Sequence, residues 1–264
     1  MMKVLFLGER RIAMRCLQYL SEIHQQRRLE IVGIVTTADL YHNANLGLSE
    51  ASEIPFVDNQ TRNENAITSL ISTSRCNVLI SVQHPWILSD DILRAVEYRA
   101  FNLHNAKLPD YKGYNSISHA LLNGAKSYTT SIHWLSEKVD SGDVAYTKSI
   151  PVQTDDDAIS LYERTLDPAV QIFVKLIEDL ISNKEPPRIP QTGKSYFYSR
   201  KDLATTKDCS SQSVEDMILT ANCSFFPPDE PAYIHNHSGK IYLIPESRWM
   251  EIVHYWRPAN MPEI

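Results

Sequence analysis

Short apolar runs alternate with amphipathic segments through the first hundred residues, and this alternation limits the folds open to the chain more than any other feature. Lys3–Leu7, Ile31–Val35 and Val78–Val82 are apolar enough to be strands buried on both faces. Ile12–Ile23 and Glu64–Ser74, which lie between them, have the periodicity of helices. Strand, helix and strand in this order give a parallel sheet with right-handed crossovers. We therefore predict an α/β fold with a Rossmann-like, mostly parallel sheet, whose ligands bind at the carboxyl ends of its strands.

The second half of the chain predicts a smaller module after a proline-rich segment. Asn183–Thr192 contains three prolines in ten residues and is expected to be a linker. Beyond it, Ala232–His235 and Lys240–Ile244 flank a Ser238–Gly239 turn and predict a β-hairpin. We expect a catalytic domain over residues 1–190 and a small C-terminal domain with this hairpin over residues 191–264.

Composition excludes several classes of protein. The chain carries 26 basic and 32 acidic residues, a formal charge of -6, which argues against a broad nucleic-acid surface. Its four cysteines form no Cys-x-x-Cys pair and are expected to be free thiols. No apolar run approaches the roughly 18 residues of a membrane span, and Gly8 is not followed by the further glycines of a dinucleotide fingerprint. We expect a cytoplasmic protein with no membrane or nucleic-acid partner and no nicotinamide cofactor.

The stretch from residue 101 to 116, FNLHNAKLPDYKGYNS, carries the strongest chemical signal. Alternation along a strand puts Asn102 and His104 on one face. An amide can donate a hydrogen bond to a carbonyl oxygen that is becoming an oxyanion, and an imidazole can move the proton of an attacking amine. Asp140 follows in SEKVDSGDV and supplies a carboxylate that could orient the imidazole. Together these three residues predict an acyl-transfer site.

Two simpler interpretations apply to these residues. A single Asn or His on a strand is usually structural, but the packing of a strand needs neither all three side chains nor the glycine-bearing turn. A metal site at His104 and Asp140 lacks a third ligand at a suitable spacing, so no metal is expected. His235 and His237 alternate beside the hairpin turn and are expected to be exposed strand residues.

These motifs resemble the 10-formyltetrahydrofolate-dependent formyltransferase family. The resemblance rests on Asn-x-His, the Leu-Pro-x-Tyr-Lys-Gly turn, an Asn-Gly helix end and Asp-Ser-Gly-Asp, and is clearest from about Val78 to Val152. It implies that Asn102, His104 and Asp140 are catalytic. Many relatives read Ser-Leu-Leu-Pro after the histidine, whereas residues 105–109 here are NAKLP, a departure that bears on the acceptor.

The resemblance also implies the binding residues. On the formyl-donor side it places Gln83, His84, Pro85, Trp86 and Ile87 after the Val78–Val82 strand, and Trp134, Lys138 and Val139 near the aspartate turn. Trp86 could equally be a core residue. On the acceptor side, proximity suggests Lys112, Gly113, Tyr114 and Asn115.

The function we expect is transfer of a formyl group from 10-formyltetrahydrofolate to a nucleotide-linked amino sugar. The C-terminal segments resemble those of sugar N-formyltransferases, so the acceptor is expected to be a 3- or 4-amino dideoxyhexose, with dTDP as the carrier, destined for surface polysaccharide. By the same resemblance we expect a homodimer. Phosphoribosylglycinamide and methionyl-tRNA formyltransferases are the alternatives within the family. A 10-formyltetrahydrofolate hydrolase and a non-catalytic folate-binding protein are the alternatives from other classes.

Overall fold

The computed structural model describes residues 1–44, 54–245 and 248 of the 264-residue chain. These residues form two compact units that are both discontinuous in sequence. The first contains Met1–Lys112, Thr129–Ile150 and Thr165–Tyr196, and the second contains the stretches between them and the remainder of the chain. A domain boundary between residues 190 and 191 stays a prediction. Within the predicted C-terminal domain, residues 246–247 and 249–264 lie outside the described residues.

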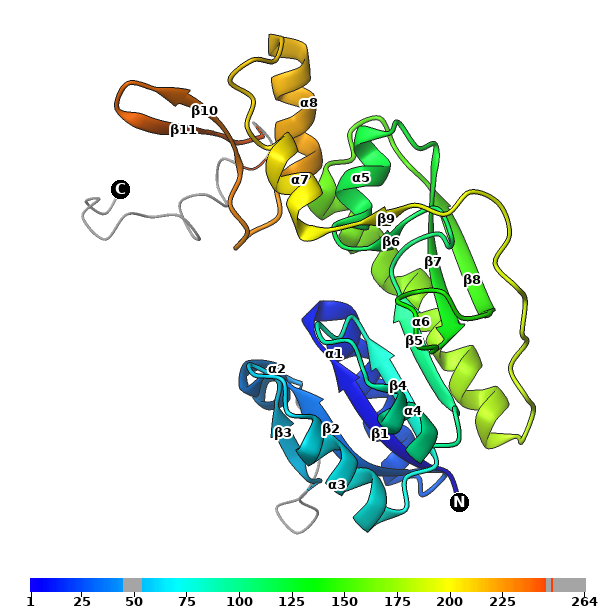
Figure 1. Ribbon diagram of the computed structural model, residues 1–264. Helices are drawn as coiled ribbons and strands as arrows, with labels where there is room; N and C mark the ends of the chain where they lie inside the picture. Colours follow the sequence, from blue (N-terminus) through cyan, green and yellow to red (C-terminus); the bar gives the residue numbers. More distant parts are fainter. Residues whose placement is uncertain (45–53, 246–247, 249–264) are drawn as a thin grey trace. The chain divides into compact units, whose positions relative to one another are not determined.

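The first unit is built on a seven-stranded sheet (Figure 1). Its strands, in spatial order, are β3 (Phe56–Asp58), β2 (Glu30–Thr36), β1 (Lys3–Gly8), β4 (Val78–Val82), β5 (Ala100–His104), β7 (Ser127–Trp134) and β8 (Val144–Pro151). The strands from β3 to β5 are parallel, and β7 pairs antiparallel to β5. The predicted mostly parallel α/β sheet is confirmed.

Apolar strands and helix faces explain this arrangement. Val4, Leu5, Phe6 and Leu7 of β1 have no exposed surface, as expected for a central strand covered on both faces. The first unit contains the helices α1 (Arg10–Gln25), α2 (Ala38–Asn43), α3 (Glu64–Ser74) and α4 (Asp90–Ala95), together with the part of α6 (Ala158–Ile181) that follows Arg164. Residues of α3 and α4 share one apolar cluster with β1, β2, β4 and Ala100 of β5.

Among its described residues, the second unit contains the start of α6 as far as Arg164, three whole helices and the hairpin. The whole helices and the hairpin strands are α5 (Ser116–Leu122), α7 (Arg200–Thr206), α8 (Val214–Ser224), β10 (Ala232–Asn236) and β11 (Gly239–Leu243). Cys209, Ala221 and Ala232 form a small core beneath the hairpin. The predicted hairpin is confirmed, with its turn at residues 237–238, one position earlier than expected. Two further short strands, β6 (Lys112–Gly113) and β9 (Phe197–Tyr198), pair with each other.

Across the described ranges, no helix combines the length and the apolar composition that crossing a membrane requires.

Candidate active site

The end of β5 presents polar side chains on one face and apolar ones on the other. Phe101 pairs with Trp134 of β7, and their rings lie 4.3 Å apart on the apolar face. Asn102 pairs with His133 of β7 on the opposite face. Ala100, two residues before Asn102, belongs to the apolar cluster under α3 and α4. A single face of the sheet therefore changes from apolar to polar as β5 reaches its carboxyl end.

The orientation of the Asn102 amide is set by its neighbours. The Ser81 hydroxyl, on β4, donates to Asn102 Oδ1 at 2.8 Å, so the amide oxygen is occupied and Nδ2 is directed the other way. Asn102 Nδ2 lies 3.1 Å from His133 Nε2 and 3.5 Å from Asp140 Oδ1. The amide thus presents its donor group toward the polar cluster.

His133 is a member of this cluster that the sequence analysis missed. Its side chain is fully buried. Nδ1 lies 2.8 Å from the Trp134 carbonyl oxygen and must donate to it, so Nε2 is free to accept from Asn102. The available sequence signal was the alternation of the polar residues Thr129, Ser131 and His133 in the predicted 129–134 strand.

His104 also has a tautomer fixed by the backbone. Its Nε2 is 2.7 Å from the Tyr111 carbonyl oxygen, an acceptor, so Nε2 carries a hydrogen. Its Nδ1 is 3.6 Å from Asp140 Oδ2. The nitrogen that can exchange a proton is therefore Nδ1, which lies beside the carboxylate.

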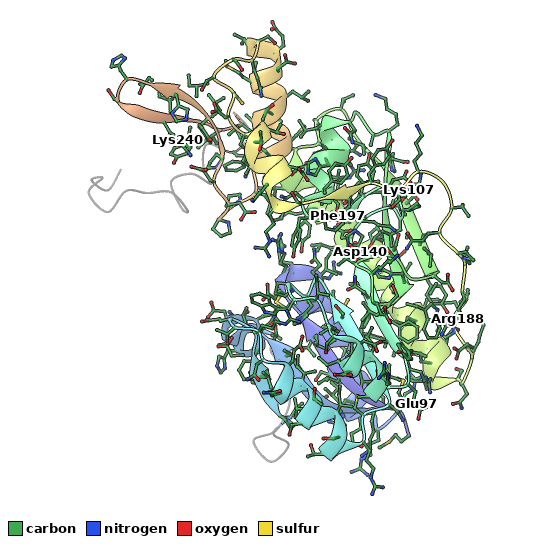
Figure 2. All side chains as sticks on the ribbon, in the orientation of Figure 1. Glu97, Lys107, Asp140, Arg188, Phe197 and Lys240 are labelled. Atoms are coloured by element: carbon green, nitrogen blue, oxygen red, sulfur yellow. The ribbon has the colours of Figure 1, made fainter. Side chains whose placement is uncertain are left out.

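Asp140 joins the two imidazoles. Its side chain is buried, with Oδ2 toward His104 and Oδ1 3.4 Å from His133 Nε2. The residue lies in the turn between β7 and β8 and is labelled in Figure 2. The structure therefore assembles Asn102, His104 and Asp140 as the sequence predicted, and adds His133. An amide donor, a proton carrier and a carboxylate at this spacing suit acyl transfer to an amine.

The loop after β4 holds the first group of predicted donor-side residues. Gln83 has a φ of 53°, a left-handed conformation that turns the chain sharply at the end of the strand. Asn59 Nδ2 lies 3.3 Å from His84 Nδ1, and Trp86 Nε1 donates to the Asn59 carbonyl oxygen at 3.1 Å. Ile87 is 56% exposed and Trp86 38% exposed. Trp86 is therefore a tethered surface residue and not a core residue.

His84 itself is neutral near pH 7. Burial lowers the pKa of its imidazole to about 4. Its Nε2 is a buried atom with no hydrogen-bond partner among the described residues. His84 and Trp86 also line a small pocket with Val35, Val57, Asn59 and Leu88, among others, and this pocket does not include Asn102, His104 or Asp140.

The second group of predicted donor-side residues, Trp134, Lys138 and Val139, is split between β7 and the Asp140 turn. Trp134 is 2% exposed and packs between Phe101 and Arg188, whose guanidinium carbon lies 3.5 Å from the Trp134 ring centre. Its side chain is therefore on the face opposite Asn102, where it serves packing, and is not available as a folate contact on the polar face. Lys138 is exposed and Val139 half-buried, both in the Asp140 turn.

The acceptor-side residues fall in both units. Lys112, in the first unit, donates from Nζ to Ser141 Oγ at 3.0 Å, next to Asp140. Gly113, Tyr114 and Asn115 belong to the second unit. Gly113 has a φ of 86°, and a Cβ there would lie 2.3 Å from the Tyr198 carbonyl oxygen, so glycine is required. The Arg200 guanidinium lies 4.5 Å from the Tyr114 ring centre.

The sequence of this chain is similar to those of known formyltransferases. Residues 2–177 match the family model described as Formyl transferase. A methionyl-tRNA formyltransferase of Sulfurihydrogenibium sp. is 26% identical over 208 residues, which cover 75% of this chain. A GDP-perosamine N-formyltransferase of Brucella melitensis is 28% identical over 171 residues, 64% of this chain. The chain spans somewhat less than two thirds of the length of these curated relatives, 65% and 64%.

A solved structure shares the fold. The N-formyltransferase of Helicobacter canadensis, in complex with folinic acid and dTDP-3-aminofucose, has a TM-score of 0.66 to this chain at 18% sequence identity. The similarity covers 91% of this chain and 86% of that one.

Proposed function

The chain belongs to the formyl transferase family, and we propose that it transfers a formyl group from 10-formyltetrahydrofolate to the amine of a nucleotide-linked amino sugar. The observation that carries the proposal is the buried cluster of Asn102, His104, His133 and Asp140 at the end of β5 and β7. The finer assignment, also a proposal, is a dTDP-linked 3- or 4-amino dideoxyhexose.

Asn102 is placed to stabilise charge. As the acceptor nitrogen attacks the formyl carbon and the new C–N bond forms, negative charge develops on the formyl oxygen. The Asn102 amide presents Nδ2 because Ser81 occupies Oδ1. Nδ2 carries two hydrogens, and the one that faces Asp140, over the longer distance of 3.5 Å, is the one that turns to the formyl oxygen.

His104 and Asp140 are placed to carry the proton that the amine must lose. His104 Nε2 donates to the Tyr111 carbonyl oxygen, which leaves Nδ1 and the nearby Asp140 carboxylate as the basic groups. A proton arriving at this pair is stabilised by the carboxylate and is available for the leaving nitrogen. Asp140 also holds the imidazole in one orientation.

The loop after β4 fits a reduced folate, which supplies the formyl group. Trp86 and Ile87 offer exposed apolar surface, and the buried Nε2–H of His84 lacks a partner among the described residues. A flat heterocycle with hydrogen-bonding edges suits apolar walls with one polar group. We therefore assign the formyl donor to residues 83–87, together with Lys138, Val139 and the backbone of residue 134.

Two observations favour a sugar amine over methionyl-tRNA as the acceptor. The net charge of -6 opposes the electrostatic attraction that binding of a tRNA backbone requires. The Helicobacter canadensis neighbour, which covers most of this chain, is described with an amino sugar nucleotide, and a Brucella relative acts on GDP-perosamine. The similarity to a methionyl-tRNA enzyme keeps that acceptor as the second candidate.

Residues 112–115 remain our candidates for the acceptor side. Lys112 contributes a cation beside the Asp140 turn. Within the second unit, Tyr114 and Arg200 form a ring and cation pair, which suits a nucleotide because an aromatic ring stacks on a base and a guanidinium pairs with phosphate. Gly113 and Asn115 shape the backbone there, with φ values of 86° and 55°.

The test is a panel of acceptors offered together with 10-formyltetrahydrofolate. It includes dTDP- and GDP-linked 3-amino and 4-amino sugars, glycinamide ribonucleotide and methionyl-tRNA, with formylated product measured by mass spectrometry. We expect product from an amino sugar nucleotide and none from the other two classes. Formate release without any amine would identify a hydrolase. Folate binding with neither product nor formate would identify a binding protein.

A further inference from the structure

A glutamine outside the matched family region holds the turn that carries Asp140. Gln191 Nε2 lies 2.9 Å from the Asp140 carbonyl oxygen and 2.7 Å from the Gly142 carbonyl oxygen. The amide nitrogen has two hydrogens, one for each carbonyl. Its Oε1 has no partner among the described residues, and flipping the amide would set Oε1 against both carbonyls. The two carbonyls therefore fix the orientation of the Gln191 side chain.

The backbone brings Gln191 to this position. Two residues earlier, Ile189 forms an antiparallel bridge to Val144 of β8, with N···O distances of 2.8 Å and 3.0 Å. Trp134 Nε1 donates to the Pro187 carbonyl oxygen at 2.9 Å. The segment that its prolines predicted to be a linker is therefore part of the first unit, which extends to Tyr196.

The Asp140 turn has a conformation that needs such support. Asp140 has a φ of 47°, a left-handed conformation that is unfavourable for a residue with a Cβ. A Cβ on Gly142 would lie 1.9 Å from the Trp134 carbonyl oxygen, so the turn lies directly against the end of β7. Rotation of the backbone at residue 140 would move the carboxylate away from both imidazoles.

We propose that Gln191 is a positioning residue, which fixes the Asp140 carboxylate between His104 and His133. This inference rests on the proposed function for its catalytic meaning. The family match ends at residue 177, so the segment beyond it supplies part of the support of the active site. Gln191 itself touches only backbone atoms of the turn in the hydrogen bonds described.

The test replaces Gln191 by methionine, which keeps the length of the side chain and removes both donors. Gln18→Met is the matched control, because Gln18 Nε2 also donates to one backbone carbonyl, that of Ala44, at 3.0 Å in the same unit. We expect kcat for formyl transfer to fall about 10-fold in Gln191→Met, with KM for 10-formyltetrahydrofolate within about 2-fold, because a small misplacement of a catalytic group lowers the rate. Gln18→Met should change kcat by less than about 2-fold.

A double-variant cycle separates positioning from general loss of structure. In an Asp140→Asn background, Gln191→Met should lower kcat by less than about 2-fold, because the carboxylate that Gln191 positions is gone. An equal 10-fold loss in both backgrounds would mean a structural role and would overturn the proposal. An unchanged kcat in the single variant would do the same.

A readout without turnover separates this proposal from the proposed function. NMR signals of the His104 and His133 rings should change in Gln191→Met and stay unchanged in Gln18→Met, at one pH and with both proteins folded by circular dichroism. If the wild-type protein formylates no acceptor, the proposed function fails while this measurement still decides the position of Asp140. Unchanged ring signals in Gln191→Met would overturn the inference.

Discussion

The turn that carries Asp140 and the loop that carries Trp86 belong to the same unit but differ in how firmly they are held and how exposed their side chains are. The Asp140 turn is held by Gln191, by the Lys112–Ser141 hydrogen bond and by close packing against β7, and its carboxylate is buried. The loop after β4 leaves Trp86 and Ile87 exposed, and its side chains are tethered through Asn59.

This difference fits the separate roles that we propose for the two segments, catalysis at the Asp140 turn and donor binding at the loop after β4. Chemistry needs donors and bases that do not reorganise during the reaction, and the Asp140 turn is constrained from three directions. Binding of an apolar heterocycle needs accessible surface, which the loop after β4 supplies.

The largest loss should follow removal of the oriented donor or of the proton carrier. We expect Asn102→Ala and His104→Ala each to lower kcat by about 10²-fold or more, with normal folding, because oxyanion donors and general bases contribute effects of this size. Asn123→Ala is the control, since Asn123 lies at the end of α5 and its side chain donates to the Tyr198 hydroxyl at 3.2 Å. Near-native turnover in either catalytic variant, measured by formylated product, would break the contrast.

Acid should weaken the loop after β4 through His84. Its pKa is lowered from 6.5 to about 4 in the folded state by burial. The unfolded chain therefore binds the proton first, and stability is lost as pH falls from about 6.5 to about 4. The full shift sets an upper bound of about 3 kcal/mol, and we expect about 2 kcal/mol because the ring is not fully enclosed.

The measurement is urea unfolding of wild type and His84→Gln between pH 4 and pH 7.5. The difference in unfolding free energy between the two proteins should shift in favour of His84→Gln as pH falls, by about 2 kcal/mol. A difference that is constant with pH would show that the ring is not held neutral in the fold.

His133 should matter to turnover, although it was not predicted from the sequence. His133→Leu removes the acceptor for Asn102 Nδ2 and a neighbour of Asp140, and we expect kcat to fall about 10-fold with KM for the donor little changed. His133→Gln retains an acceptor of similar reach and should recover part of the loss. Equal losses in the two variants would point to packing in place of positioning.

The smallest effect should come from the exposed loop, and in KM. Trp86→Ala removes apolar surface at the proposed donor site, so KM for 10-formyltetrahydrofolate should rise about 5-fold while kcat stays within about 2-fold. Tyr98→Ala removes another exposed aromatic residue, 41% accessible, and serves as the control. A fall in kcat without a rise in KM for Trp86→Ala would move this loop from binding to chemistry.

Local patterns were sufficient to predict the sheet and the shared face of Asn102 and His104. Largely apolar segments at β1, β2 and β4 favour burial on both faces, and the structure places these strands inside the sheet. Asn102 and His104 share a face because side chains alternate along any strand. The hairpin turn was predicted to within one residue because Ser238 and Gly239, which are typical turn residues, separate two short strand patterns in the sequence.

Other features required the folded chain, because they depend on partners far apart in sequence. Trp134 turns away from the polar face because the antiparallel register pairs it with Phe101, and that register is set by the turn and by neighbouring strands. His133 enters the site through the same pairing, opposite Asn102. Gln191 is brought to the Asp140 turn by the bridge between Ile189 and Val144. The prolines of Asn183–Thr192 predicted only a linker, because no local pattern shows that bridge.

Periodicity and side-chain chemistry were thus enough to predict the element types, the parallel sheet and the residue types of the proposed acyl-transfer site. The tertiary structure decided which of those residues meet, in which tautomer and with what support. The pairing of Asn102 with His133 and the Gln191 hydrogen bonds join residues that are 31 to 51 positions apart, and no local pattern encodes such a contact.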